Sequence, residues 1–580
     1  MAALSHYLER ALEALPRREG RPFLEFAARR AEEHGVLVIE APTGYGKSMI
    51  SQAFALRSLC EGLKCIVAFP LRALLEDQLS KFRAMLSRLN YDERIIGARY
   101  MHHPESKYLL RPISLTTIDT LSLTLFGMAP EDLETALKYY DGTSTRSMGH
   151  YLFSRSMVLL SDLVLDEVHL LADMTKSLNF LVALIWIMAS HGGRVALMSA
   201  TIPRALEELL RAEGERIGLG FAKFSENPDE AFLEERRRKR YEVHLEGIRG
   251  DKFERILGWL KEGMRDGFRR SIVAFNTIPE AIEFYKMARE RLALPRDGVL
   301  LLHSRFTEAD RAMKGKRIRE LGESDEYLIV ATQVIEAGVD ISSDLFISDL
   351  APASSLIQRL GRFLRYKGEA EGRVHLWYED WVEGKGRYKG VYDWGLIEGT
   401  RDFLEGRSSM NFHDPESYGP LLDYVYHEGS FSVSWKEIRE LISITKVLRD
   451  PRWAIEAFMR LEGSFVREDA LIPAIPSPSL TDGAPMSELM GHLVPMGLST
   501  LSKLRPREEL VVDEEDPGRA LRKRLQNGFW DRGRERALRR ALSSKFIAFV
   551  VEGSYDGDLG LVTKVEEGAE LSKGRGQLDR

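Results

Sequence analysis

The sequence of 580 residues is poor in cysteine, in long apolar stretches and in net positive charge. Its two cysteines, Cys60 and Cys65, are too few for a disulfide framework or a zinc site, which favours reduced thiols and a cytoplasmic protein. The longest apolar run, 180–189, falls far short of the roughly 20 residues that a membrane-spanning helix needs. The first positions carry charges where a signal peptide would be apolar. We therefore expect no association with a membrane.

Positive charge is not in excess. Lysine and arginine number 82 against 88 acidic residues, which gives a formal net charge of −6. Without a global positive field, any affinity for nucleic acid must come from local basic grooves.

Short apolar runs alternate with helical patterns along the first 385 residues. Such alternation predicts α/β domains with parallel sheets flanked by helices. The runs typical of buried parallel strands are 36–40, 65–70, 158–167 and 194–200, followed by 271–276, 298–304, 327–332 and 345–350. We predict two such domains, 1–225 and 226–385, and a mixed α+β accessory domain over 386–580.

Two segments at domain edges carry separate expectations. The charged stretch 226–240 has no apolar period and is expected to connect the two α/β domains or to form a solvated helix. Near the C-terminus, 545–553 and 558–565 are expected to pair as a hairpin.

The segment APTGYGKS, residues 41–48, lies between an expected strand and an expected helix, as a phosphate-binding loop must. Glycines let backbone N–H groups approach phosphate oxygens, a lysine reaches the β- and γ-phosphates, and a serine hydroxyl ligates Mg²⁺. Ala41 replaces the first glycine of the general pattern. The loop predicts ATP binding by Thr43, Gly44, Tyr45, Gly46, Lys47 and Ser48.

LVLDEVH, residues 163–169, places two carboxylates at the end of a buried strand. We expect Asp166 to hold Mg²⁺ and Glu167 to activate the attacking water as a general base. His169 is expected to couple the site to the neighbouring domain. An acidic strand end without function is the alternative, and the upstream phosphate loop argues against it.

Further polar residues follow the strands of the first domain. Ser199 and Thr201 are expected to link the ATP-bound and strand-bound states. Four residues at strand ends are expected to contact a nucleic-acid backbone: Arg72, Thr116, Thr117 and Asp119. Each alone is little better than a turn or a cap, and their order in the chain carries the prediction.

In the second domain, SSLIQRLGRFLR places Gln358, Arg362 and Arg365 at helical spacing, and so on one expected helix face. Two guanidinium groups that face another domain can act as arginine fingers on a γ-phosphate. Such fingers typically increase the rate of hydrolysis by about 10³–10⁵. A solvated basic face is the alternative, but Gly361 beside them favours close approach to another part of the molecule.

The remaining candidates of this domain flank its strands. Asp340 is expected to reach the ribose or to bridge to the arginine fingers. Five residues are expected to grip the phosphate backbone of a strand, a contact that gives affinity without sequence preference: His303, Ser304, Arg305, Thr332 and Gly338.

The ordered motifs APTGYGKS, DEVH, SAT, FNT, TQVIEAGVDIS and QRLGRFLR resemble those of superfamily 2 helicases. Within that class the set is similar to the helicase of type I CRISPR interference, over about 36–370 and again in GSYDGDLGL at 553–561. The resemblance implies two tandem RecA-like P-loop NTPase domains that use ATP and Mg²⁺. It also implies that a guide-RNA surveillance complex (Cascade) opens the target, that the helicase moves 3′ to 5′ along the displaced single-stranded DNA, and that an HD nuclease degrades this strand.

Fused members of the family carry an HD nuclease before the first domain. Some 35 residues precede the first strand here, so we expect a separate HD nuclease subunit and no nuclease activity in this chain. The single His-Asp pair, His413-Asp414, precedes a proline and is expected to form a turn or a cap. No adenine-reading glutamine is evident around Arg21-Pro22, which leaves nucleotide selectivity open.

Other functions stay open on the sequence. The chain could be a stand-alone DNA-repair or RNA helicase, or a nucleotide-gated protein that recruits a nuclease without moving. The stretch 519–540 holds nine basic residues with Phe529 and Trp530 among them. It is expected either to bind a nucleic acid by stacking, to form an amphipathic helix with its aromatic side chains in the core, or to dock a partner.

Overall fold

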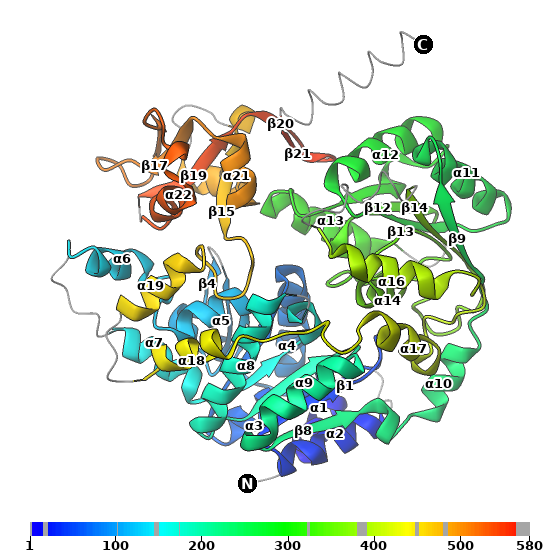
Figure 1. Ribbon diagram of the computed structural model, residues 1–580, viewed down its shortest axis with the longest axis horizontal. Helices are drawn as coiled ribbons and strands as arrows, with labels where there is room; N and C mark the ends of the chain where they lie inside the picture. Colours follow the sequence, from blue (N-terminus) through cyan, green and yellow to red (C-terminus); the bar gives the residue numbers. More distant parts are fainter. Residues whose placement is uncertain are drawn as a thin grey trace.

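The computed structural model describes residues 3–15, 21–100, 103–143, 150–172, 174–321, 325–379, 391–446, 452–479, 485–543 and 545–563. Three sheets with their helices, and a separate two-stranded hairpin, make up this part of the chain (Figure 1). No helix within it combines the length and the apolar character needed to cross a bilayer.

Domain 1 is an eight-stranded sheet in the order β4-β3-β5-β2-β6-β7-β1-β8, parallel except for the pairing of β3 with β4. Its strands are β1 (Val36–Glu40), β2 (Lys64–Phe69), β3 (Ile96–Tyr100), β4 (His103–Pro104), β5 (Ile113–Thr117), β6 (Ser161–Leu165), β7 (Val195–Ser199) and β8 (Leu219–Lys223). Its helices are α1 (Leu4–Glu13), α2 (Pro22–Glu33), α3 (Ser48–Cys60), α4 (Arg72–Arg88), α5 (Ile118–Leu125), α6 (Leu133–Tyr140), α7 (His150–Leu159), α8 (Thr175–Ser190), α9 (Arg204–Gly214) and α10 (Glu230–Arg237).

Both faces of this sheet are buried. Successive side chains of a strand point to opposite faces, so Val36 and Val38 pack with α5, α7, α8 and α9, while Leu37 and Ile39 pack with α1 to α4. Helix α10 joins the second of these cores through Phe232 and Leu233, which places the charged connection 226–240 on domain 1 as a packed helix.

Domain 2 is a six-stranded parallel sheet in the order β11-β12-β10-β13-β14-β9. Its strands are β9 (Val243–Ile248), β10 (Arg270–Ala274), β11 (Val299–Leu302), β12 (Tyr327–Ala331), β13 (Leu345–Asp349) and β14 (Arg373–Glu379). Its helices are α11 (Lys252–Arg265), α12 (Ile278–Arg291), α13 (Glu308–Glu320), α14 (Ala353–Leu360), α16 (Trp394–Leu404) and α17 (Pro415–Val425). The predicted pair of α/β domains is confirmed.

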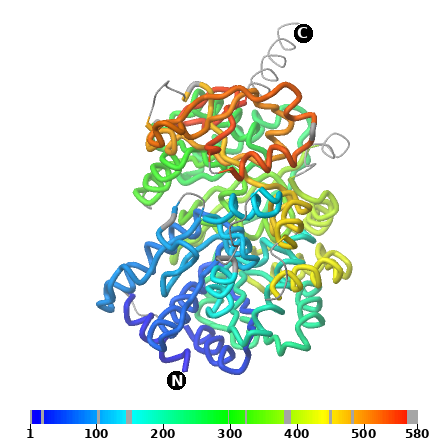
Figure 2. Tube along the Cα trace, turned by 90° about the vertical axis from the view of Figure 1, so that its left-hand side faces the viewer, coloured from blue at the N-terminus to red at the C-terminus, as the bar shows by residue number. Residues whose placement is uncertain are grey.

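The prediction of one accessory domain over 386–580 is wrong. Helices α16 and α17 pack on domain 2, whereas α18 (Trp435–Ile444) and α19 (Arg452–Arg460) pack on domain 1 (Figure 2 shows them in yellow alongside the cyan helices). A separate five-stranded mixed sheet follows, in the order β16-β15-β19-β17-β18. Its elements are β15 (Leu471–Pro476), α20 (Met486–Gly491), β16 (Val494–Gly497), α21 (Leu498–Leu504), β17 (Glu508–Val512), β18 (Ala520–Arg524), α22 (Arg534–Ala541) and β19 (Phe546–Val551).

The predicted C-terminal hairpin has different strands. Strand β19 lies inside the five-stranded sheet, between β15 and β17, and the hairpin instead joins β20 (Gly553–Asp556) to β21 (Gly560–Thr563). In the basic stretch 519–540, Phe529 and Trp530 are 6% and 9% exposed and pack in the core of that sheet, so they do not offer a stacking surface.

Candidate active site

The loop between β1 and α3 has the backbone of a phosphate cradle. Gly44 and Gly46 adopt φ angles of +82° and +99°, which residues with a Cβ rarely adopt, so glycine is needed at both turns. Helix α3 begins at Ser48 with no side-chain cap, which leaves N–H groups at its N-terminus for an anion. The Lys47 Nζ donates to the carbonyl of Ala41 at 2.8 Å, so the ammonium lies across the loop.

The Tyr45 side chain lies outside this cradle, so only its backbone can serve the predicted contact with ATP. It is fully buried against Phe23, Phe224 and Phe232. Its hydroxyl accepts from the Phe23 N–H and donates to Asp229, the residue that caps α10. Tyr45 therefore fixes the phosphate loop to α2 and α10 and leaves only its backbone for a phosphate.

Two carboxylates follow β6, at the same sheet edge as the phosphate loop. Asp166 is 6% exposed, and burial together with the charge of Glu167 raises its pKa to about 7, against the opposing charge of Lys47. Glu167 adopts a φ of +53°, a strained value for a residue with a Cβ, and its buried Oε2 has no hydrogen-bond partner among the described residues. Adjacent carboxylates with one nearby lysine fit a divalent cation, which Asp166 and Ser48 would hold.

His169 contacts the motif that follows β7 of its own domain. Its Nδ1 lies 3.1 Å from the Ser199 hydroxyl and 3.4 Å from Glu167 Oε2, and burial lowers its pKa, so it is neutral. The Ser199 hydroxyl donates to the Thr201 carbonyl at 2.7 Å. A chain of contacts therefore joins Glu167 to Ser199 and Thr201, and none of the hydrogen bonds described for His169 reaches domain 2.

The arginines of domain 2 lie beyond a helix rather than on one. Helix α14 ends at Leu360, so the prediction that Gln358, Arg362 and Arg365 share a helix face is wrong. After Gly361 the backbone turns to pair with Ser343: Leu364 adopts a φ of +44° and donates its N–H to the Ser343 carbonyl. The hydrogen bonds of this segment therefore go to a neighbouring strand end, and the helix cannot continue.

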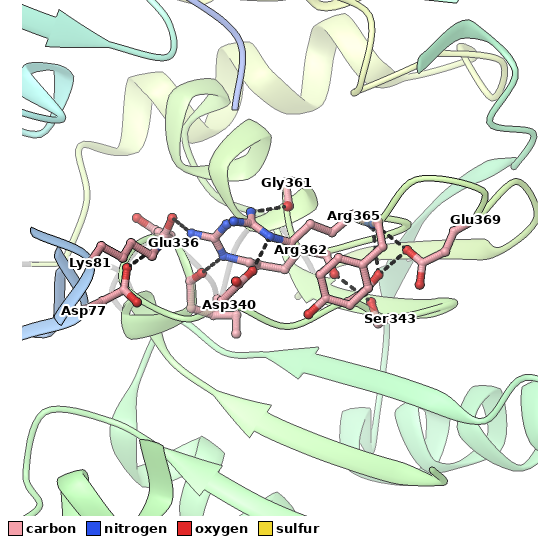
Figure 3. Close-up of polar contacts among 12 residues, drawn as sticks. Asp77, Lys81, Glu336, Asp340, Ser343, Gly361, Arg362, Arg365 and Glu369 are labelled. Atoms are coloured by element: carbon pink, nitrogen blue, oxygen red, sulfur yellow. Dashed lines mark hydrogen bonds and ion pairs between the residues drawn. The ribbon is translucent and has the colours of Figure 1, made fainter. Parts of the chain in front are cut away.

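Both guanidinium groups nevertheless lie at the interface of the two domains. The Arg365 Nε donates to Asp340 at 2.8 Å, and Figure 3 shows these two side chains together. Arg362 is 6% exposed and donates to the carbonyls of Ile335 and Glu336, while its Nη1 has no partner among the described residues. Asp340 thus stands where it was predicted to bridge to the arginines.

Thr43 of the phosphate loop meets domain 2 directly. Its hydroxyl donates to Gln358 Oε1 at 3.4 Å, and a Cβ on Gly361 would lie 3.2 Å from its methyl group. A pocket opens at this contact, between Gly44 on one side and Arg365 on the other, and Arg236 and Tyr418 complete its wall. The start of the phosphate loop and Arg365 of domain 2 therefore share one pocket.

Two of the predicted strand contacts in domain 1 are wrong. Thr116 is fully buried and donates its hydroxyl to the Arg99 carbonyl, so it faces no solvent. Asp119 accepts two hydrogen bonds from the Arg467 Nε, at 2.9 and 2.8 Å. Because Arg467 also donates to the Pro70 carbonyl, Asp119 anchors the segment after α19 to the ends of β2 and β5.

In domain 2 the prediction for His303 is wrong as well. It is 2% exposed, and its Nε2 lies 2.9 Å from the Leu559 carbonyl, in the turn of the C-terminal hairpin. Burial lowers its pKa to about 3, so it is neutral there. Ser304 is exposed and Arg305 is half-buried, and their contact with a nucleic-acid backbone stays a prediction.

The other predicted strand contacts lie at or near the domain interface. Arg72 forms an ion pair with Glu308 of domain 2. A Cβ on Gly338 would lie 2.9 Å from the Cβ of Ala73, so this glycine permits close packing against α4. Thr117 caps α5, and Thr332 is 2% exposed at the end of β12.

The pair His413-Asp414 forms a helix cap, as predicted. Asp414 precedes α17 and accepts from the Glu416 N–H, while the buried His413 bonds the Tyr241 hydroxyl and the Phe363 carbonyl. The described part of the chain contains no cluster of three His, Cys, Asp or Glu side chains able to hold a metal.

Three arginines at or near the site were missed by the sequence patterns. Arg359 is fully buried in domain 2, Arg236 lines the pocket and Arg467 reaches the strand ends of domain 1. Arg359 stands inside the motif QRLGR and was recognisable from it. The other two lie in segments without a motif, so only the fold brings them to the site.

Two family models match the chain in order. A DEAD/DEAH box helicase model matches 25–209, and a model described as CRISPR-associated nuclease/helicase Cas3, C-terminal, matches 268–368. The CRISPR-associated helicase Cas3 of Thermoproteus tenax is 26% identical over 417 residues, which are 68% of this chain and 64% of that protein. The chain spans about half the length of other curated Cas3 relatives.

Solved structures agree in fold. Cas3 of T. fusca with AMPPNP has a TM-score of 0.64 at 16% identity, covering 97% of this chain and 72% of that one. A chain of a structure described as a CRISPR RNA-guided surveillance complex, pre-nicking, has a TM-score of 0.56 at 18% identity, covering 91% and 68%. The predicted resemblance is therefore confirmed: the two tandem α/β domains match helicase models in order, and the chain is similar to the CRISPR-associated helicase Cas3.

Proposed function

We propose that the chain is an ATP-dependent translocase and helicase on single-stranded DNA that unwinds target DNA in type I CRISPR interference. One observation supports the proposal: the phosphate loop of domain 1 meets domain 2 at a pocket that Arg365 lines, and Thr43 of the loop bonds Gln358 beside it. A site split between two domains opens and closes with their relative position, which is what a nucleotide-driven motor requires.

The predicted site residues of the two domains divide the chemistry among them. Lys47 and the backbone of 44–48 would bind the phosphates of ATP, and Asp166 and Ser48 would hold Mg²⁺, which neutralises phosphate charge. Glu167 would orient the attacking water and accept its proton, for which a buried carboxylate oxygen without a partner is suited. Arg362 and Arg365 would stabilise the negative charge that develops during hydrolysis.

The strand-binding side is proposed with fewer residues than the sequence indicated. Ser304 and Arg305 would form it on domain 2, and Thr117 and the partly exposed Arg467 would form it on domain 1. Contacts of this kind hold phosphates without reading bases. The relatives named as CRISPR-associated helicases, and the neighbour named as a surveillance complex, support single-stranded DNA as the substrate and a complex of the Cascade kind as the partner that exposes it. The two free cysteines support the cytoplasm as the compartment. Cleavage would fall to a separate HD nuclease subunit.

The proposal is tested by ATP turnover of the full chain with single-stranded DNA or RNA of equal length and composition, and by strand displacement. We expect DNA to stimulate turnover and displacement to require ATP. Stimulation by RNA alone would point to an RNA helicase instead. Glu167→Gln should bind ATP but neither hydrolyse it nor support target degradation. Degradation that survives this change would favour a nucleotide-gated recruiter.

A further inference from the structure

We propose that Arg236, on the helix α10 that connects the two domains, is a third cationic ligand for the phosphates of the nucleotide. The inference deepens the proposed function and rests on it. Arg236 adds to Arg362 and Arg365 a cation that belongs to the interdomain connection rather than to domain 2.

The guanidinium group of Arg236 spans the two halves of the site. A Cβ built on Gly44 would lie 2.9 Å from the Arg236 Nη2, so the group faces the tip of the phosphate loop. On the other side, its Nη1 lies 3.5 Å from the carbonyl of Arg365. The plane of the group rests on the Phe232 ring at 4.9 Å, which holds it in this position.

Arg236 is buried without the partners that a buried cation needs. The residue is 8% exposed, and its Nε is buried without a hydrogen bond, with Glu235 Oε2 at 3.4 Å as its nearest carboxylate oxygen. Within the described residues its Nη2 makes no hydrogen bond. Buried guanidinium groups are ordinarily paired, because taking a charge out of water costs several kcal/mol. A buried guanidinium group with so few acceptors, facing a phosphate loop, is therefore suited to bind an anion.

The charges around Arg236 point the same way. The pocket is lined by Arg236 and Arg365 and by no carboxylate. Burial lowers the pKa of Arg236, and the charges of Arg365 and Arg21 lower it further, against the opposing contributions of Glu235 and Tyr418. The guanidinium groups of Arg236 and Arg365 repel each other, and a bound anion would offset this repulsion. A phosphate group, which accepts the two parallel N–H donors of an arginine, has the matching charge and geometry.

The test is binding of ATP, ADP and adenosine to the full chain by calorimetry, for the wild type and four variants. Arg236→Gln removes the charge, and Arg236→Lys keeps it without the planar fork. Arg238→Gln, an exposed residue of the same segment, is the matched control. Lys47→Ala tests the nucleotide site itself.

We expect Arg236→Gln to weaken ATP and ADP about 10- to 100-fold and adenosine by less than about 2-fold, since the loss is one of charge-assisted bonds to phosphate. Arg236→Lys should fall between it and the wild type, and decides the matter if the Gln variant does not fold. Normal ATP affinity in both variants, or an equal loss for ATP and adenosine, overturns the inference while Lys47→Ala still loses ATP. If the wild type binds no ATP, the proposed function fails first and the inference fails with it.

Discussion

Replacing Arg362 by methionine should stop ATP hydrolysis with little change in the stability of the fold. Arg359→Met should instead act mainly by destabilising the fold. The two arginines stand three residues apart and are both buried, so a sequence comparison cannot separate them. Their partners differ. Arg362 has two carbonyl acceptors and one unpaired nitrogen, whereas Arg359 donates to Glu336, Ser348, Asp349, Asn276 and Tyr392.

The magnitudes follow from these partners. Burial, and then the charge of Arg365, lower the pKa of Arg362 from 12.5 to about 9, so the buried cation costs up to about 5 kcal/mol. Its two hydrogen bonds return about 1.5–3 kcal/mol each. Arg362→Met should therefore change the free energy of unfolding by no more than about 2 kcal/mol, while a lost finger lowers hydrolysis by about 10³–10⁵. Arg359→Met leaves Glu336 as an unpaired buried charge and should cost about 3–5 kcal/mol.

The assay is urea unfolding of both variants under one condition, together with DNA-stimulated ATP turnover. Equal destabilisation by the two substitutions would refute the reasoning, because it would make Arg362 a structural residue. Turnover of Arg362→Met within tenfold of the wild type would refute the assignment of the finger.

Further perturbations test the interface. Gly338→Ala places a Cβ 3.0 Å from the Leu74 N atom at a φ of +83°, so we expect weaker domain closure, seen as a larger radius in solution scattering and slower ATP turnover. Burial raises the pKa of Glu40 from 4.5 to about 7 despite the charge of Lys223. The folded chain thus binds this proton more tightly than the unfolded chain, and wild-type stability falls as the pH rises from about 4.5 to 7. Glu40→Gln removes this loss and should exceed the wild type by about 1–2 kcal/mol at pH 8 but not at pH 4, measured by urea unfolding. Asp119→Asn should leave the affinity for single-stranded DNA unchanged or higher, because it releases Arg467; a tenfold loss in a filter-binding assay would restore Asp119 as a strand contact.

The eight strands predicted for the two α/β domains lie within a few residues of observed ones, because a parallel strand covered on both faces is a continuous apolar run, whereas β3, β4, β5, β8, β9 and β14 were not among the predicted runs. The run 65–70 becomes Lys64–Phe69, and 345–350 becomes Leu345–Asp349. Residues that bind through the backbone, such as Gly44 and Gly46, could be predicted too, since only glycine takes their φ angles readily.

Side-chain partners could not be predicted in this way. Thr116 and His303 occupy motif positions, yet one bonds a carbonyl inside its own sheet and the other a carbonyl some 256 residues away. The helical spacing of Gln358 and Arg365 continues past the point where Gly361 ends the helix, because spacing alone does not encode a helix end. The apolar segment of β19 predicts a strand but says nothing of its neighbour, and β15 lies about 70 residues earlier.

The C-terminal sheet is attached to both motor domains, and this constrains how the pocket can close. The segment that leads into the sheet is anchored to domain 1. There the buried Arg155 donates to the carbonyls at the end of α18, and Arg467 pairs with Asp119. The hairpin that follows the sheet is anchored to domain 2. There the Tyr555 hydroxyl accepts from the Thr307 N–H, and the Leu561 N–H donates to the Arg305 carbonyl. The segment 468–470 and residue 552 join the sheet to these anchors. Because one anchor contacts Arg305 of domain 2 and the other lies at the ends of β2 and β5 of domain 1, we expect a rotation between the domains to move the sheet relative to at least one of them.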